Sequence, residues 1–176
     1  MSLTKASYSM ISGASANAID FGLSTSGAAA DNTTAIQAAI SSISAVGGVV
    51  QIPNGTYSIN SITIPAEVSI QGYGPRATIF NYAGSGSAFT LGGTGTSLYY
   101  NCGLSNLSIV MSNSAATAVY CKGTAFAKVT DLYIEGPIVS PRTTAGVIID
   151  GSNASSFFND VRNIQCNHIH VGYQVL

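Results

Sequence analysis

Residues Asp31 to Ile59 read DNTTAIQAAISSISAVGGVVQIPNGTYSI and contain a helix pattern followed by a strand pattern. The first half places apolar residues at helical spacing, which predicts a helix over residues 32–46 with one apolar face. The members of that face are Ala35, Ile36, Ala39, Ile40 and Ile43. Gly47-Gly48 is expected to end the helix, because glycine adopts left-handed backbone angles without penalty. From Val49 to Ile52 the apolar pattern becomes that of a strand.

The position of this helix suggests its purpose. Asp31 or Asn32 is expected to cap its N-terminus, since a short side-chain oxygen accepts hydrogen bonds from the first turn. A helix with one apolar face, placed before many short strands, can cover the open end of a stack of strands. Ile19–Phe21 is expected to be a short strand that leads into the cap.

Downstream of the helix, short predicted strands follow one another with turn residues between them and no second long helix. Such a pattern is typical of an all-β solenoid, sandwich or barrel. The strands are expected at Val49–Ile52, Tyr57–Ile59, Ile62–Ile64, Val68–Gln71, Thr78–Tyr82 and Ala88–Leu91.

An internal repeat favours the solenoid. One motif begins at Leu104, Val129 and Val161, and a second motif begins at Phe89, Val119 and Val147. The two motifs alternate along the chain, and successive copies lie 25 to 32 residues apart. That distance is one coil of a β-helix with at least two strands in each coil.

The alternation within the first motif assigns faces. Its apolar positions are expected to point inward and to stack from coil to coil; they are Leu107, Ile109, Leu132, Ile134, Ile164 and Cys166. The residues between them, Ser108, Tyr133 and Gln165, are expected to point outward. One register just before these strands holds Asn106, Asp131 and Asn163, which predicts a structural ladder of side chains.

The N-terminal part of the chain resembles a known family. The segments 20–22, 31–40 and 47–57 are similar in order and spacing to the N-terminal signature of pectate-lyase-like right-handed β-helices, especially those of bacteriophage tailspikes. The resemblance implies a right-handed parallel β-helix with an N-terminal capping helix. It also implies a homotrimeric tailspike or tail-fibre subunit that attaches to the virion and recognises a host surface polysaccharide. The loop before the helix, residues 26–30, lacks the acidic residues usual in the family.

Composition restricts the possible partners. Only 7% of the 176 residues are charged and the net charge is −1, whereas about a quarter of an ordinary soluble domain is charged. Without a basic patch we expect no nucleic-acid binding, and without a long apolar run we expect no membrane insertion. The N-terminus has no signal-peptide pattern. We therefore expect synthesis in the host cytoplasm and a final location on the virion, at its tail or capsid surface.

The domain organisation is expected to be simple. Residues 1–18 are interpreted either as a mobile leader or as an arm that docks onto the virion. The anchors of that arm would be Leu3, Tyr8, Met10 and Ile11. Residues 19–176 are expected to form the β-helix, whose last coil lacks a predicted cap and is therefore expected to be incomplete.

Few residues suggest chemistry. Glu135 and Asp150 end neighbouring predicted strands, with Arg142 in the loop between them. Together with Tyr133 they are candidates for carbohydrate binding, although solvated loop positions are the simpler interpretation. Glycoside hydrolysis needs two carboxylates across a sugar, and Glu135 and Asp150 are the pair that one face could hold. The resemblance implies for a lyase a groove with acidic calcium ligands and a basic residue, and no such cluster is evident, so catalytic residues stay unknown.

No cofactor or metal site is expected. His168 and His170 share a strand face but have no third ligand, and the three cysteines lack metal-site spacing, so that small buried apolar roles are expected for them. The aromatic residues in or beside loops fit either sugar stacking or subunit contacts; they are Tyr99, Tyr100, Tyr133, Phe157 and Phe158. Two alternatives to the attachment protein remain, namely a polysaccharide hydrolase or lyase with its site on later coils, and a purely structural capsid-decorating protein.

Overall fold

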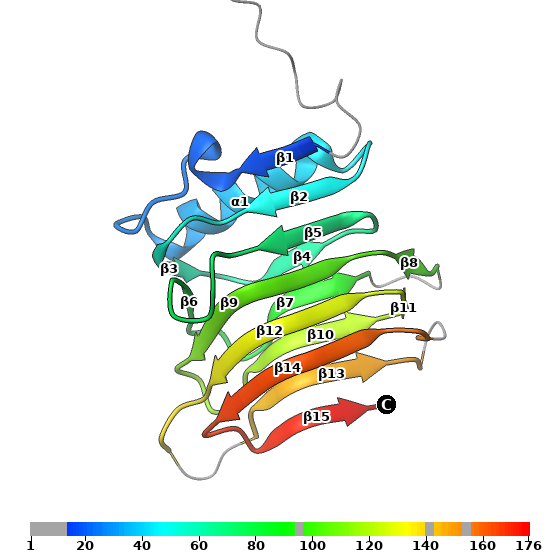
Figure 1. Cartoon of the computed structure of the whole chain (residues 1–176). Coiled ribbons are helices and arrows are strands. Elements are labelled where there is room, and N and C mark those ends of the chain that lie inside the picture. The colour runs from blue at the N-terminus through cyan, green and yellow to red at the C-terminus, as the bar shows by residue number, and fades with distance from the viewer. Residues whose placement is uncertain (1–13, 94–96, 140–142, 153–155) are drawn as a thin grey trace, which may run out of the picture.

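The computed structural model of the chain describes residues 14–93, 97–139, 143–152 and 156–176. Within them the chain is a right-handed parallel β-helix in which every strand pairing is parallel. Its helix α1 covers one end of the stack, and β15 lies at the other end (Figure 1). This arrangement confirms the solenoid and the capping helix that the sequence predicts.

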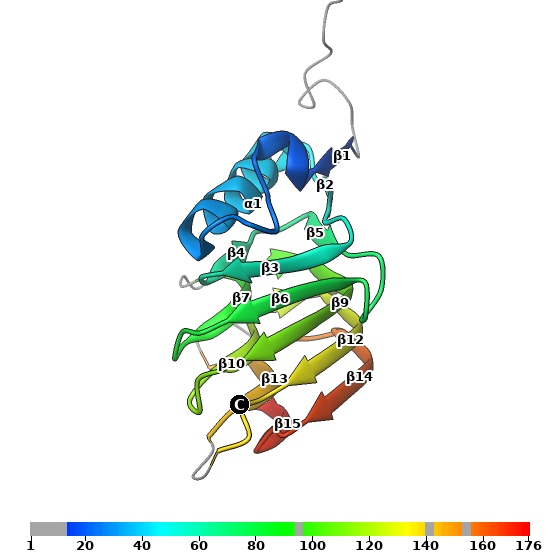
Figure 2. The same cartoon turned by 90° about the vertical axis from the view of Figure 1, so that its left-hand side faces the viewer.

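Three faces build each coil. The first face consists of β1 (Ala14–Asn17), β2 (Gly48–Gln51), β5 (Val68–Gln71) and the first halves of β9 (Gly103–Met111), β12 (Lys128–Glu135) and β14 (Asp160–Asn167). The second face consists of β3 (Gly55–Ile59), β6 (Thr78–Tyr82) and the second halves of β9, β12 and β14 (Figure 2). The third face is a separate sheet of β4 (Ile62–Ile64), β7 (Ser87–Gly92), β10 (Thr117–Lys122), β13 (Ala145–Asp150) and β15 (Val171–Val175). A small corner sheet pairs β8 (Tyr99–Tyr100) with β11 (Thr124–Ala125).

The cap differs from its sequence prediction at both ends. Helix α1 spans Ala29–Ile43 and ends before Gly47. Its N-cap residue is Ala28, which makes no side-chain hydrogen bond, so neither Asp31 nor Asn32 is the N-cap. Asn32 is instead fully buried inside the helix and bonds to the backbone of Ser24. The prediction of a strand at Ile19–Phe21 is also wrong, because Ala18–Phe21 forms a 3₁₀ helix.

The solenoid begins earlier in the chain than expected. Residues Ala14–Asn17, which the sequence assigns to the arm, form β1 and pair in parallel with β2. The predicted anchors Leu3, Tyr8, Met10 and Ile11 lie outside the described residues.

The core is a set of stacked apolar columns. Leu107 pairs with Leu132, and Leu132 with Ile164; Ile109, Ile134 and Cys166 align in the same way. The first two members of each column are buried, as predicted. Cys166 departs from the prediction because it is exposed on the last strand of its face, while Cys102 and Cys121 are buried.

The described part of the chain contains no helix that is both long enough and apolar enough to span a membrane.

Candidate polysaccharide-binding groove

A groove of about 330 Å³ lies on the second face, where four neighbouring strands cross it. One row of paired positions runs along its length, from Ile79 on β6 through Ser108 and Tyr133 to Gln165 on β14. Parallel strands lie about 4.8 Å apart, so this row spans roughly 14 Å along the solenoid axis. The groove therefore follows the solenoid axis and is open to an extended ligand.

The floor of the groove contains a polar group without a partner among the described residues. Ser108 is 2% exposed, and its Oγ makes no hydrogen bond to any of them. A buried hydroxyl without a partner costs about 1–3 kcal/mol relative to a bonded one. The groove wall next to it is apolar at Ile79 and Val110. The Ser108 hydroxyl has almost no accessible surface, so it lies beneath the groove and out of reach of a bound ligand.

A linked set of polar side chains forms the rim on β12 and β14. The Tyr133 hydroxyl donates to Glu135 Oε2 over 3.3 Å, and Asn167 Nδ2 donates to the Tyr133 hydroxyl over 3.4 Å. His168 Nδ1 lies 3.7 Å from Glu135 Oε1 and has no hydrogen-bond partner in the described part of the chain. These contacts hold the Tyr133 ring and the Glu135 carboxylate beside the groove.

The opposite wall comes from the turn between β5 and β6. Pro75 and Arg76 line the groove there, and Arg76 forms no ion pair with any described residue. The groove thus combines this guanidinium with one carboxylate, an aromatic ring and several neutral hydrogen-bonding groups.

Of the three predicted carbohydrate-binding candidates that the structure describes, two lie together. Tyr133 and Glu135 lie in the groove, but Asp150 ends β13 in the other sheet, so Glu135 and Asp150 do not share a face. The chain turns a corner between β12 and β13, which the strand pattern alone does not reveal. Arg142 lies outside the described residues.

Asp150 has a local structural role. Its buried carboxylate accepts hydrogen bonds from the backbone N–H of Ser152 and from the Tyr120 hydroxyl. Bonds from Ser152 first, and from Tyr120 next, lower the pKa of Asp150 to about 2. Burial, followed by the bond to Asp150, raises the pKa of Tyr120 to about 12. Both groups are already partnered, which distinguishes them from Ser108.

The predicted ladder positions share one backbone conformation. Asn106, Asp131 and Asn163 all have left-handed backbone angles, with φ of 57°, 57° and 53°. They stand in one register between the first and second faces, and Asn163 Nδ2 donates to Asp131 Oδ1 over 2.9 Å. The column therefore bends the strands at the corner.

Sequence reasoning misses several residues that matter here. The sequence predicts only an outward direction for Ser108, and it predicts no role for Arg76. It also misses Phe126, whose ring stacks on Phe158 with centroids 5.5 Å apart; both rings are exposed. Ala125 pairs with Phe157, so Phe126 occupies the position of Phe158 one coil earlier. An alignment of the repeats that included the residues before each first motif would therefore find Phe126.

Comparison with known proteins gives the same architecture. Residues 15–98 match the family model described as rhamnogalacturonase A/epimerase, pectate lyase-like. The described part of the chain thus has the fold of a pectate-lyase-like β-helix. Among curated protein sequences none matches it.

Solved structures of similar fold include enzymes and a viral protein. The A-module of the mannuronan C-5 epimerase AlgE6 from Azotobacter vinelandii superimposes on this β-helix with a TM-score of 0.70 at 18% identity, over 86% of this chain and 44% of the epimerase chain. The protein ORF18 of Geobacillus virus E2 gives a TM-score of 0.55 at 20% identity, over 86% of this chain and 40% of the viral one. The pectate-lyase-like β-helix described here spans less than half the length of either protein.

Proposed function

We propose that this β-helix is a phage polysaccharide-binding protein and that it holds a glycan strand in the groove across β6, β9, β12 and β14. The observation that carries the proposal is the row of groove positions that leads to Tyr133 and Gln165 along the solenoid axis, with the Glu135 carboxylate beside it. Sugar hydroxyls both donate and accept hydrogen bonds, so a glycan can bond to these side chains.

The rest of the groove suits the same ligand. Tyr133 offers an aromatic ring with a polar tip, which binds amphipathic ligands well. Gln165 and Glu135 offer further hydrogen-bonding groups on the same rim. The groove runs along the solenoid axis, so successive sugars of one strand meet successive coils.

The phage assignment rests on similarity. A viral protein shares the fold, and the N-terminal signature resembles that of tailspikes. From this resemblance we propose a tailspike or tail-fibre subunit that forms a homotrimer, with the segment before β1 directed to the virion and the groove to the host surface.

A second candidate function is modification of the bound polysaccharide. The specific observation in its favour is the Glu135 carboxylate beside His168, since such pairs can transfer protons. Glu135 is the one carboxylate that lines the groove among the described residues. A two-carboxylate hydrolase mechanism therefore finds less support here than proton abstraction from a sugar.

Affinity electrophoresis tests the binding proposal. The protein is run through gels that contain rhamnogalacturonan, mannuronan or one of a panel of bacterial capsular polysaccharides. We expect at least one polymer to retard the chain, and Tyr133→Ala to weaken that retardation at least about tenfold, or 1.4 kcal/mol.

The matched control is Tyr100→Ala, which removes an exposed tyrosine from the corner sheet outside the groove. It should be retarded like the unmodified chain. Retardation that depends on Tyr100 and not on Tyr133 would refute the groove as the binding site.

A further inference from the structure

A second hollow lies beside the groove, toward the capped end of the solenoid. It encloses about 170 Å³, and we call it the cap-side pocket. Val110 lines both this pocket and the groove. The rest of its lining includes Ala29, which is the first residue of α1, together with Ser58, Asn60, Asn81 and Ser112. The pocket therefore adjoins the groove on one side and the cap on the other.

A row of paired strand positions joins the two hollows. Ser58 on β3 pairs with Asn81 on β6, and Asn81 pairs with Val110 on β9. Val110 pairs in turn with Glu135 on β12, which lines the groove. Paired positions of parallel strands lie about 4.8 Å apart and point to the same side of the sheet. A ligand beside Glu135 can therefore continue over Val110 to Asn81 and Ser58 without leaving the second face.

The cap-side pocket offers neutral hydrogen-bonding groups. Ser58, Asn60, Asn81 and Ser112 are exposed, and their side chains make no hydrogen bond to any described residue. Amides and hydroxyls of this kind complement sugar hydroxyls, which both donate and accept. The half-buried Val110 adds an apolar contact surface between the amides and the groove.

The charges of the two hollows differ. The groove has Arg76 and Glu135 in its walls, whereas no charged residue lines the cap-side pocket in the described part of the chain. Asp31 lies in the first turn of α1, so the positive end of the helix dipole beside the pocket already has a carboxylate. The pocket therefore suits a sugar without a charged group.

The cap holds the β3 side of the pocket in place. The backbone N–H of Asn60 donates to Thr33 Oγ1 over 2.8 Å, and the Ser58 carbonyl accepts from Asn32 Nδ2 over 3.1 Å. Thr33 and Asn32 both belong to α1. A pocket whose backbone is already fixed loses less conformational entropy when it binds a ligand.

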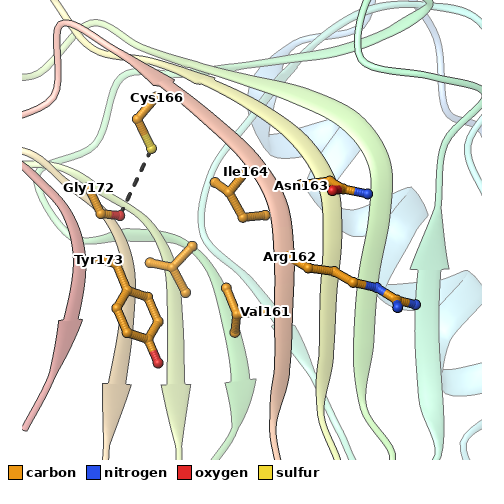
Figure 3. A pocket seen from close by; sticks show the side chains of 8 residues that line it. Val161, Arg162, Asn163, Ile164, Cys166, Gly172 and Tyr173 are labelled. Atoms are coloured by element: carbon orange, nitrogen blue, oxygen red, sulfur yellow. Dashed lines mark hydrogen bonds between the residues drawn. The ribbon is translucent and has the colours of Figure 1, made fainter.

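A cavity of about 570 Å³ elsewhere in the molecule does not belong to this path. Val161, Ile164 and Tyr173 are among the residues that line it, and it shares no lining residue with the groove or the cap-side pocket (Figure 3). Ile164 pairs with the buried Leu132 of the core, so this cavity adjoins the interior of the solenoid. The path over Val110 stays on the outer surface of the second face.

We propose that the cap-side pocket is a second subsite for the same glycan strand and that it takes an uncharged sugar. This inference rests on the glycan binding proposed above and extends it toward the cap. The bound strand would cross five strands of the second face, namely β3, β6, β9, β12 and β14. Asn81, in the middle of the pocket's row, would donate to or accept from its hydroxyls.

Calorimetric titration of the full chain with two oligosaccharides tests the inference. Both are cut from the polymer that retards the chain in affinity electrophoresis; one has about two sugars and the other about six, enough to pass all five strands. We expect the long one to bind at least about tenfold more tightly. Asn81→Ala should weaken binding of the long one at least about threefold, the net effect of one hydrogen bond, and leave the short one unchanged.

Two further variants sharpen the test. Ala83→Trp places a large ring at an exposed residue of the pocket lining, and it should weaken the long oligosaccharide alone. Asn54→Ala is the matched control for Asn81→Ala, since it removes an exposed amide that lines neither hollow, and it should change neither affinity. The circular dichroism spectra of all three variants should match that of the unmodified chain.

Salt tests the uncharged character of the bound sugar. Salt screens contacts between exposed charges and leaves neutral hydrogen bonds nearly unaffected. The ratio of the two affinities should therefore stay the same from low to high salt. A ratio that falls with salt would overturn the assignment of an uncharged sugar to the pocket.

The outcomes separate this inference from the proposed function. Equal affinity for the two oligosaccharides, with Tyr133→Ala weakening both, would overturn the cap-side subsite and leave the groove in place. A long-chain advantage that is lost in Phe126→Ala and kept in Asn81→Ala would place the additional sugars at the aromatic corner of Phe126, Phe157 and Phe158, which also overturns it. If no polymer retards the chain, the proposed function fails and the subsite fails with it.

Discussion

Asn163 donates a hydrogen bond from its side-chain Nδ2 to Oδ1 of Asp131 over 2.9 Å, one coil away. Both residues hold left-handed backbone angles at the corner between two faces. The corner therefore depends on residue types that tolerate positive φ, and a solenoid repeats this requirement in each coil.

Replacement of Asp131 tests the cost of that corner. Asp131→Val places a β-branched residue at φ 57° and removes the acceptor of Asn163, so we expect a loss of about 2 kcal/mol in the free energy of unfolding. Asp131→Gly removes only the hydrogen bond and should cost less. Urea denaturation measures both. Gln165→Val, at an exposed strand position, is the control and should change stability by less than about 0.5 kcal/mol.

Buried Asn32 links the cap to the first coil. Its Oδ1 accepts from the Ser24 backbone N–H, and its Nδ2 donates to the carbonyls of Gly27 and Ser58 over 3.2 and 3.1 Å. Asn32→Asp should cost about 3 kcal/mol, because it removes both donations and sets a carboxylate against two carbonyls. Asn60→Asp, at an exposed position, should be nearly neutral in the same denaturation series. Equal stability of the two variants would contradict this role of Asn32.

The apolar face of α1 should carry much of the cap's stability. Ile36 is fully buried against the first coil, and Ile36→Ala should lower the free energy of unfolding by about 2–4 kcal/mol. Ser41→Ala, on the exposed face of the same helix, is the control. A small effect at Ile36 would mean that the helix is not an integral part of the core.

Asp150 should make the free energy of unfolding fall at strongly acid pH, and Tyr120 should make it fall at strongly alkaline pH. The pKa of Asp150 falls from 3.8 to about 2 on folding, so its contribution is complete above pH 3.8 and is lost as pH falls through about 2. The pKa of Tyr120 rises from 10.0 to about 12, so its contribution is complete below pH 10 and is lost as pH rises through about 12.

Thermal unfolding across this pH range tests the pair. Tyr120→Phe should abolish the loss of stability at alkaline pH that Tyr120 causes. It should reduce the loss of stability at acid pH without abolishing it, because the hydrogen bond from Ser152 to Asp150 remains. An unchanged alkaline profile in Tyr120→Phe would contradict the assignment.

The repeat predicts much of this architecture from sequence. The spacing of Leu107, Leu132 and Ile164 sets the register of three coils, because inward positions must stack on one another in a solenoid. The N-cap prediction is wrong because Asn32 serves tertiary contacts with Ser24 and Ser58 that no local pattern contains.

The composition of the groove is harder to predict from the sequence. Tyr133 and Glu135 follow the repeat and are predicted candidates, but Arg76 comes from a turn between β5 and β6 that the repeat does not contain. The sequence places Ser108 on the outward face of its strand, and only the folded structure reveals that its hydroxyl is buried beneath the groove.

Whether the groove on the second face binds a glycan is best decided by a structure of the chain with an oligosaccharide of the retarding polymer. We predict sugar density along the row from Ile79 to Gln165, with a sugar oxygen within hydrogen-bonding distance of the Gln165 amide or the Glu135 carboxylate. Sugar bound instead at the aromatic corner or on the outer face of the β13 sheet, with the groove empty, would contradict glycan binding in the groove.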